Sequence, residues 1–174
     1  MRIGIVGYGA RSSLANLFHD PERGTAVTAV CDPSPARRDL AREHFGEGLL
    51  TCSELVTLLE SDVDAVVISS PDYLHAPQAI AALTAGKAVY VEKPLATTVE
   101  QADAVLEAAE VSGSLLFVGH NMRYMPVIET LKKAIDDGLI GAVKSIWCRH
   151  FVGHGGDFFF RDWHADRTKV NSLL

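Results

Sequence analysis

The sequence contains few cysteines and no pattern in which they would act together. Cys31, Cys52 and Cys148 lie far apart, and no CxxC pair is present. This arrangement offers neither a disulfide framework nor a cysteine metal site, and it is typical of a reducing compartment. No apolar run reaches the roughly 18 residues of a membrane-spanning helix, and Gly4 and Gly7 interrupt the apolar start too early for a signal peptide. We therefore expect a soluble, cytoplasmic protein without a membrane partner.

Long runs of one charge are also absent. The chain has 16 basic and 22 acidic residues, a net charge of −6 and no basic stripe, so no nucleic-acid partner is expected. An acidic chain can still bind an anionic cofactor, because backbone N–H groups at helix N-termini hold phosphates. With 174 residues, 48% of them hydrophobic, it can form one domain with a proper core, or one domain and part of another.

Short apolar segments alternate with helical ones over residues 1–121. Strands are predicted at 3–6, 26–31, 65–68, 88–91 and 115–118, and helices at 11–19, 35–45, 53–59, 76–85 and 99–111. Ser34, Ser53 and Thr98 are predicted helix N-caps, and Gly86 is a predicted helix end. Nearly continuous Val and Ile runs suit strands that are covered on both faces. This pattern predicts an α/β fold with a doubly wound parallel sheet.

The pattern changes after about residue 121. A helix is predicted at 127–136, closed by Gly138, and a long strand at 143–152 with Trp147 and Phe151 on one face. Residues 153–174 are rich in glycine and phenylalanine and show no clear period. Since one strand and such a tail cannot form a core, we expect residues 122–174 to be the incomplete start of an α/β substrate domain. An unpaired strand with apolar neighbours favours pairing between copies, so a homo-oligomer is expected.

A glycine motif connects the first predicted strand to the first predicted helix. It comprises Gly7, Tyr8, Gly9, Ala10, Arg11 and Ser12. The first glycine permits a tight turn, the second permits close approach to a pyrophosphate, and the third position requires a small residue, here serine. The helix N-terminus would then hold the phosphates. In this strand–turn–helix context the motif predicts dinucleotide binding.

Asp32 ends the second predicted strand, 25 residues after Gly7. An acid at about this position accepts both ribose hydroxyls of NAD and repels the 2′-phosphate of NADP. Arg37 and Arg38 leave NADP open, although a solvated helix face also explains them. A methyltransferase that uses S-adenosylmethionine places an acid at a similar point, so these residues alone leave the chemistry undecided.

Two further segments follow predicted strands and should lie at the same sheet edge as the glycine motif. Ser69–His75 follows the strand at 65–68, and Glu92-Lys93-Pro94 follows the strand at 88–91. A lysine at this edge can polarise a hydroxyl oxygen as hydride leaves its carbon, although a surface lysine in a proline turn is the alternative. Lys93–Pro94 is an X–Pro bond, the only type of peptide bond that realistically adopts the cis form.

The ordered series of motifs resembles the glucose–fructose oxidoreductase / inositol dehydrogenase / rhizopine-catabolism family over about residues 1–150. The matching pieces are residues 7–12, Asp32, 71–75, 86–87 leading into 92–94, 119–126 and 138–141. The resemblance implies a Rossmann domain over residues 1–121 that binds NAD. It also implies an enzyme that transfers hydride between nicotinamide and a secondary alcohol of a sugar, cyclitol or related polyol. A non-catalytic dinucleotide-binding regulator is the alternative, but it would not need Lys93.

The same resemblance implies roles for individual residues. Lys93 is similar to the catalytic lysine of the family, and Glu92 to its neighbour near the nicotinamide ribose. Cofactor contacts are also implied for Ser69, Ser70, Pro71, Tyr73, His75, Asn121 and Arg123. His75 is expected to cap the next helix and face the cleft, with a structural role as the alternative.

The proton-transfer aspartate and histidine of the family have no match in residues 153–174, so we expect the 174-residue chain itself to be inactive. His154, Asp157, Asp162, His164 and Asp166 are available there, but their spacing alone does not indicate a metal site, and none is predicted. They are better suited to a loop at the substrate cleft.

Overall fold

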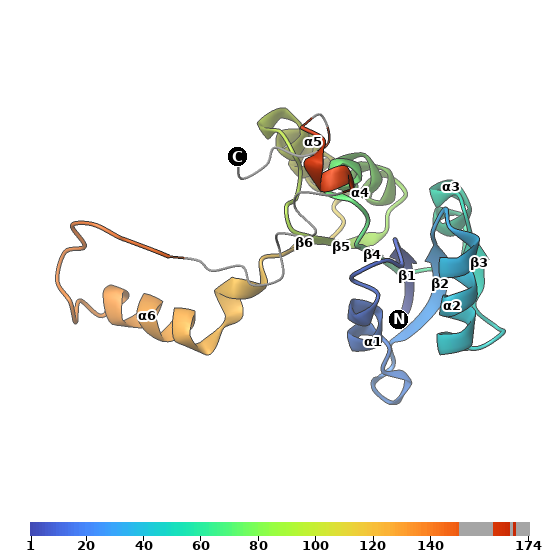
Figure 1. Ribbon diagram of the computed structural model, residues 1–174, viewed down its shortest axis with the longest axis horizontal. Coiled ribbons are helices and arrows are strands. Elements are labelled where there is room, and N and C mark those ends of the chain that lie inside the picture. The colour runs from blue at the N-terminus through green and yellow to red at the C-terminus, as the bar shows by residue number, and fades with distance from the viewer. Residues whose placement is uncertain (150–161, 168, 170–174) are drawn as a thin grey trace.

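The computed structural model describes residues 1–149, 162–167 and 169. Its centre is a sheet of six parallel strands in the order β3-β2-β1-β4-β5-β6 (Figure 1). The strands are β1 (Arg2–Val6), β2 (Ala26–Cys31), β3 (Leu50–Cys52), β4 (Ala65–Ile68), β5 (Ala88–Glu92) and β6 (Leu116–Gly119). In this order the chain turns back between β1 and β4, and ligands of doubly wound folds bind beyond the carboxyl ends of the strands at that point.

Helices cover both faces of the sheet. They are α1 (Ser13–Phe18), α2 (Pro35–Phe45), α3 (Leu55–Leu59), α4 (His75–Thr84) and α5 (Val99–Ser112), followed by α6 (Pro126–Asp136). Short 3-10 helices are η1 (Pro21–Arg23), η2 (Asp72–Leu74), η3 (Asn121–Tyr124) and η4 (Asp162–Ala165). Helices α3, α4 and α5 contribute to one core cluster, whereas α1 and α2 contribute to the other.

Alternate residues of β1 and β5 enter different cores. In β1, Ile3 and Ile5 pack against α1 and α2, whereas Val6 belongs to the cluster with α3, α4 and α5. In β5, Val89 and Val91 face that second cluster as well. Each such side chain is at most 3% exposed, and its burial stabilises the fold by about 1.5–3 kcal/mol. The Val and Ile runs therefore form strands because both of their faces are covered.

Most predicted elements are confirmed within two residues. Thr98 caps α5 by accepting a hydrogen bond from the Gln101 N–H, and Gly86 follows α4 with a φ of +73°. Ser53 is not the cap of α3, because Glu54 occupies that position and forms no side-chain cap bond. Strand β3 was not predicted at all. It consists of three residues that pair with β2, and three residues are too few to show a period.

The predicted strand at 143–152 is wrong for the part that the structure describes. Residues 143–149 belong to no strand, and none of them pairs with a described strand. An apolar segment becomes a strand only when a partner accepts its backbone hydrogen bonds, so the pattern alone is insufficient. Residues 150–152, including Phe151, lie outside the described residues, as do His154, Asp157 and Phe158–Phe160.

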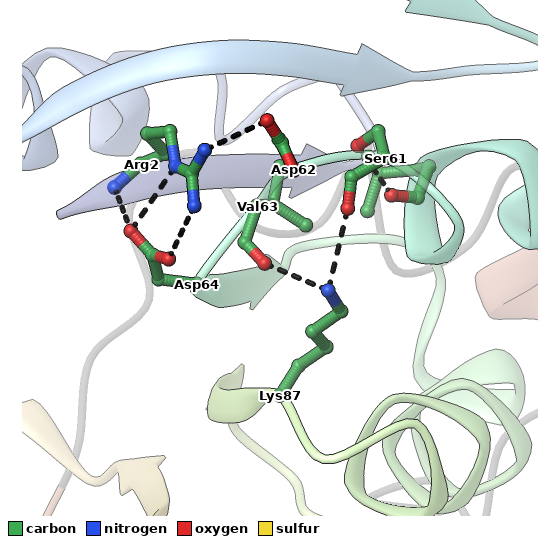
Figure 2. A network of polar contacts seen from close by, with 7 residues as sticks. Arg2, Ser61, Asp62, Val63, Asp64 and Lys87 are labelled. Atoms are coloured by element: carbon green, nitrogen blue, oxygen red, sulfur yellow. Dashed lines mark hydrogen bonds and ion pairs between the residues drawn. The ribbon is translucent and has the colours of Figure 1, made fainter.

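A network of ion pairs and hydrogen bonds lies where the parallel strands begin, at the amino-terminal ends of β1 and β4 (Figure 2). The Arg2 guanidinium lies 2.9 Å from Asp62 and 3.0 Å from Asp64, and the Arg2 N–H donates to Asp64 at 2.6 Å. Nearby, the Lys87 ammonium donates to the carbonyl oxygens of Ser61 and Val63, at 3.3 and 2.8 Å. These contacts join β1, β5 and the loop before β4, away from the strand ends that carry the candidate site.

Helix α6 extends away from the sheet (Figure 1). Most of its residues are exposed, including Val127 and Leu131 at 66% and 54%. The 3-10 helix η4, by contrast, returns to the sheet-bearing part, where Trp163 meets Tyr73 edge to face with ring centroids 6.0 Å apart. Among the described helices, none has the length and apolar character needed to cross a membrane.

Candidate functional site

The glycine motif forms a tight turn pressed against the loop after β4. Gly7 has a φ of +86°, and a Cβ at this position would lie 2.8 Å from both Cα and N of Ser70. The Ser69 hydroxyl donates to the Gly7 carbonyl oxygen at 2.8 Å. At Gly9, by contrast, an added Cβ would have no other atom within 4 Å. The first glycine therefore serves packing, and the second keeps the adjacent space open.

Asp32 is buried at the end of β2 and binds the backbone of the glycine turn. Its carboxylate accepts hydrogen bonds from the N–H groups of Tyr8 and Ser34, at 2.7 and 2.9 Å. Each carboxylate oxygen has a further lone pair, so both can still accept from another donor. Arg38 is engaged nearby, since its guanidinium donates to the carbonyl oxygens of Asp32 and Pro33.

The segment after β5 places a carboxylate and a lysine at the same edge. The Glu92 side chain is 7% exposed and accepts a hydrogen bond from the Tyr90 hydroxyl at 3.2 Å. Burial raises the pKa of Tyr90, and the adjacent Glu92 carboxylate raises it further. Lys93 is exposed, and the peptide bond between it and Pro94 is cis.

These segments surround one cavity of about 520 Å³. It is lined by Gly9, Ala10, Arg11, Arg37, Ser69, Ser70, Pro71, Asp72, His75, Glu92, Lys93, Trp163 and His164. The cavity thus lies beyond the carboxyl ends of β1, β4 and β5, where the strand order reverses. Nine of the predicted site residues meet here, including the proposed catalytic Lys93.

Other predicted site residues lie outside this lining. The Tyr8 side chain is buried, its hydroxyl is 3.1 Å from His44 Nδ1, and its N–H faces Asp32. Asn121 and Arg123 are exposed on η3. The remaining residues outside the lining are Gly7, Ser12, Asp32 and Tyr73.

His75 does not cap α4, so this expectation is wrong. It is the first residue of the helix, follows the N-cap Leu74 and is 1% exposed. Its ring nitrogens instead contact two loop carbonyl oxygens, those of Ser70 and Pro94. The ring does face the cavity, as predicted.

Arg37, Asp72, Trp163 and His164 also line the cavity. The sequence suggested Arg37 for a phosphate of NADP and His164 for a loop at the substrate cleft, whereas it gave Asp72 no role of its own and did not indicate Trp163. Burial raises the pKa of Asp72, although the nearby His75, Lys93 and His164 oppose this shift. Asp72 could have been recognised from its position after β4. No signal in the sequence places Trp163 beside that strand end, because η4 is far away along the chain.

The residues present suit a dinucleotide. The open position at Gly9 admits a bulky group against the backbone. Arg11 supplies hydrogen-bond donors along the same cavity, and the hydroxyl oxygens of Ser69 and Ser70, whose protons go to Gly7 and Gln78, can accept. Arg37 lies at the cavity as well. This donor set is appropriate for an anionic, hydroxyl-rich ligand.

The chain belongs to an oxidoreductase family with an NAD-binding Rossmann fold. The family model matches residues 1–120. This finding confirms the resemblance and the fold class inferred from the sequence.

Relatives include inositol 2-dehydrogenase of Salmonella typhimurium (strain LT2), 34% identical over 158 residues, or 87% of this chain and 46% of the relative. A 1-carboxy-3-chloro-3,4-dihydroxycyclohexa-1,5-diene dehydrogenase of Comamonas testosteroni is 32% identical over 98% of this chain and 42% of the relative. The chain thus spans about half the length of the curated relatives it matches.

Solved structures of dehydrogenases have a similar fold. The WlbA dehydrogenase of Bordetella pertussis, in complex with NADH and UDP-GlcNAcA, matches with a TM-score of 0.75 and 30% identity, over 80% of this chain and 43% of that one. The scyllo-inositol dehydrogenase of Lactobacillus casei, with NAD(H) and scyllo-inositol, matches with a TM-score of 0.73 and 28% identity, over 81% and 42%.

Proposed function

We propose that this chain is the cofactor-binding part of a dehydrogenase that acts on a secondary alcohol of a sugar, cyclitol or related polyol. The observation that carries the proposal is the single cavity shared by the glycine turn, the loop after β4 and Lys93. The inositol dehydrogenases among the relatives support a polyol substrate. Residues 1–121 would form the NAD domain, and residues 122–174 would begin the substrate domain.

The proposed roles follow from position. The backbone at Gly9 and Ala10 would hold the cofactor, the hydroxyl oxygens of Ser69 and Ser70 would accept hydrogen bonds from it, and Asp32 would accept from the adenosine ribose. NAD, when bound, supplies the hydride acceptor or donor. Lys93 would stabilise the alcohol oxygen and assist its loss of a proton. Asn121 and Arg123 are proposed for the nicotinamide end, where Arg123 would contact either cofactor or substrate.

Further proposals concern the preferred cofactor, the assembly and the location of the protein. Asp32 favours NAD, whereas exposed Arg37 at the cavity leaves NADP as the alternative. The exposed apolar residues of α6, among them Val127 and Leu131, support a homo-oligomer. The free thiols of all three cysteines support a cytoplasmic location.

NADH titration of the 174-residue chain, followed by nucleotide fluorescence, tests the binding part of the proposal. We expect saturable NADH binding and none of S-adenosylhomocysteine; the opposite preference would overturn the proposal.

The catalytic part needs Lys93→Ala in the longest protein that the gene encodes. Turnover of an inositol should fall by roughly 10²–10⁴, the usual effect of losing a positioned proton-transfer group. NADH affinity should change far less, because Lys93 is not among the residues proposed to hold the phosphates or the adenosine ribose. Near-normal turnover in this variant would remove Lys93 from the mechanism.

A further inference from the structure

His75 connects the two loops that form the walls of the cavity. Its Nδ1 lies 2.6 Å from the Pro94 carbonyl oxygen, and its Nε2 lies 2.9 Å from the Ser70 carbonyl oxygen. Ser70 belongs to the loop after β4, and Pro94 directly follows Lys93 after β5. The ring is 1% exposed, so water does not compete for either contact. One buried side chain thus joins two loops that lie far apart along the chain.

Lys93 depends on such a support. Its side chain is exposed, and it forms no hydrogen bond or ion pair with the residues that the structure describes. The position of the lysine is therefore set by its backbone, and the Pro94 carbonyl is the adjacent anchoring point. Ser70 is itself held firmly, because its hydroxyl donates to Gln78 at 2.6 Å and its backbone packs against Gly7.

We propose that His75 is a positioning residue that ties the Ser70 and Pro94 carbonyls together and so fixes Lys93 at the cavity. Carbonyl oxygens only accept hydrogen bonds, and a neutral imidazole has a single N–H to donate. A neutral ring therefore donates to one of the two carbonyls and packs against the other, and an imidazolium donates to both.

Asp72 interacts electrostatically with the same groups. It lies three residues before His75, on η2, and its carboxyl interacts with His75, with Lys93 from the loop after β5, and with His164 from η4.

The first test is the ring itself, in the unmodified 174-residue chain. The ¹⁵N and ¹H signals of the His75 ring, assigned with His75→Gln, should show a ring N–H that exchanges slowly with solvent, as a buried hydrogen bond requires. A ring N–H that exchanges rapidly would overturn the proposed contacts with the two carbonyls.

The second test follows Lys93 after reductive methylation with ¹³C-formaldehyde, with its signal assigned by Lys93→Arg. We expect His75→Gln to move the Lys93 signal. Because the ring also holds the Ser70 carbonyl, the variant should weaken NADH binding by roughly fivefold to tenfold, as the loss of one hydrogen bond implies. An unchanged signal and affinity in this variant would refute the positioning role.

Lys87→Met is the matched control. Lys87 also binds two carbonyl oxygens, those of Ser61 and Val63, but at the other edge of the sheet (Figure 2). It should lower stability without moving the Lys93 signal or NADH affinity. If it moves them as His75→Gln does, the His75 effect is only structural.

The positioning role of His75 rests on the proposed function, because it concerns the lysine proposed for catalysis. The failure of one can nevertheless be distinguished from the failure of the other. A chain that does not bind NADH, but whose Lys93 signal moves in His75→Gln, would refute the proposed function and keep the positioning role.

Discussion

Replacing Gly7 by alanine should destabilise the protein through two separate effects. The first is conformational, because Gly7 has a φ of +86° and an L-residue in a left-handed conformation costs about 1–2 kcal/mol. The second is steric, because the new Cβ would lie 2.8 Å from Cα and N of Ser70 and 3.0 Å from the Ser69 carbonyl carbon. Comfortable contacts between carbon atoms are at about 3.5–4.0 Å, and backbone atoms cannot rotate away.

The expected magnitude is the sum of both effects. Overpacking that displaces backbone costs about 1–3 kcal/mol, so Gly7→Ala should lower the free energy of unfolding by roughly 2–5 kcal/mol. With a urea m value of about 1–3 kcal/mol/M, the unfolding midpoint should fall by about 0.7–5 M. Urea unfolding at 25 °C, followed by circular dichroism, measures this shift.

Two other glycines separate the contributions. Gly24 has a φ of +82°, but no atom lies within 4 Å of its added Cβ, so Gly24→Ala should show only the conformational cost of about 1–2 kcal/mol. Gly9 has open space and no positive φ, so Gly9→Ala should leave stability within about 1 kcal/mol. Because its Cβ projects beside the cavity, it should weaken NADH binding by at least about tenfold. A Gly7→Ala variant no less stable than Gly24→Ala would refute the steric reasoning.

Two further predictions concern carboxylates. Asp32→Ala removes charge-assisted bonds worth about 1.5–3 kcal/mol, so the affinity for NADH should fall by about one to two powers of ten and the affinity for NADPH should fall much less. Fluorescence titration measures both affinities. A wild type that prefers NADPH would transfer the selecting role to Arg37. For Asp64, the hydrogen bond with Arg2 lowers the pKa from 3.8 to about 2, so its stabilising contribution is complete above pH 3.8 and is lost as the pH falls toward 2. Arg2→Met should flatten this part of a urea-unfolding profile, and equal acid sensitivity in both proteins would contradict the assignment.

The sequence predicted the sheet and its helices well because local and tertiary preferences agree there. The Val and Ile run of β4 has no face suited to water, and Thr98 offers a cap where α5 begins. β3 could not be found this way, since Leu50–Cys52 becomes a strand only through its pairing with β2. Residues 143–149 show the reverse case. Their apolar pattern favours a strand, but pattern does not supply a partner.

The candidate site was predictable in part of its membership and not in its contacts. The rule that ligands gather at strand ends indicated Asp32 and Lys93, and the family resemblance added His75. It could not show that Asp32 accepts from the Tyr8 N–H, because that bond depends on how the Gly7 turn directs a backbone dipole. A carboxylate expected to bind only a ribose therefore also shapes the turn that should hold the phosphates.

The same reasoning explains why His75 was assigned to the wrong partners. The resemblance implies that His75 caps the next helix, and such a cap would satisfy N–H groups that the first turn of a helix leaves without a partner. The fold brings the Pro94 carbonyl within 2.6 Å, and a carbonyl at the carboxyl end of β5 is adjacent to β4 only because the strands lie in the order β1-β4-β5. The partners of His75 are thus set by strand order, which no window of sequence around residue 75 contains. For residues at the ends of parallel strands, the neighbouring strand decides the role, and the sequence supplies only the chemistry.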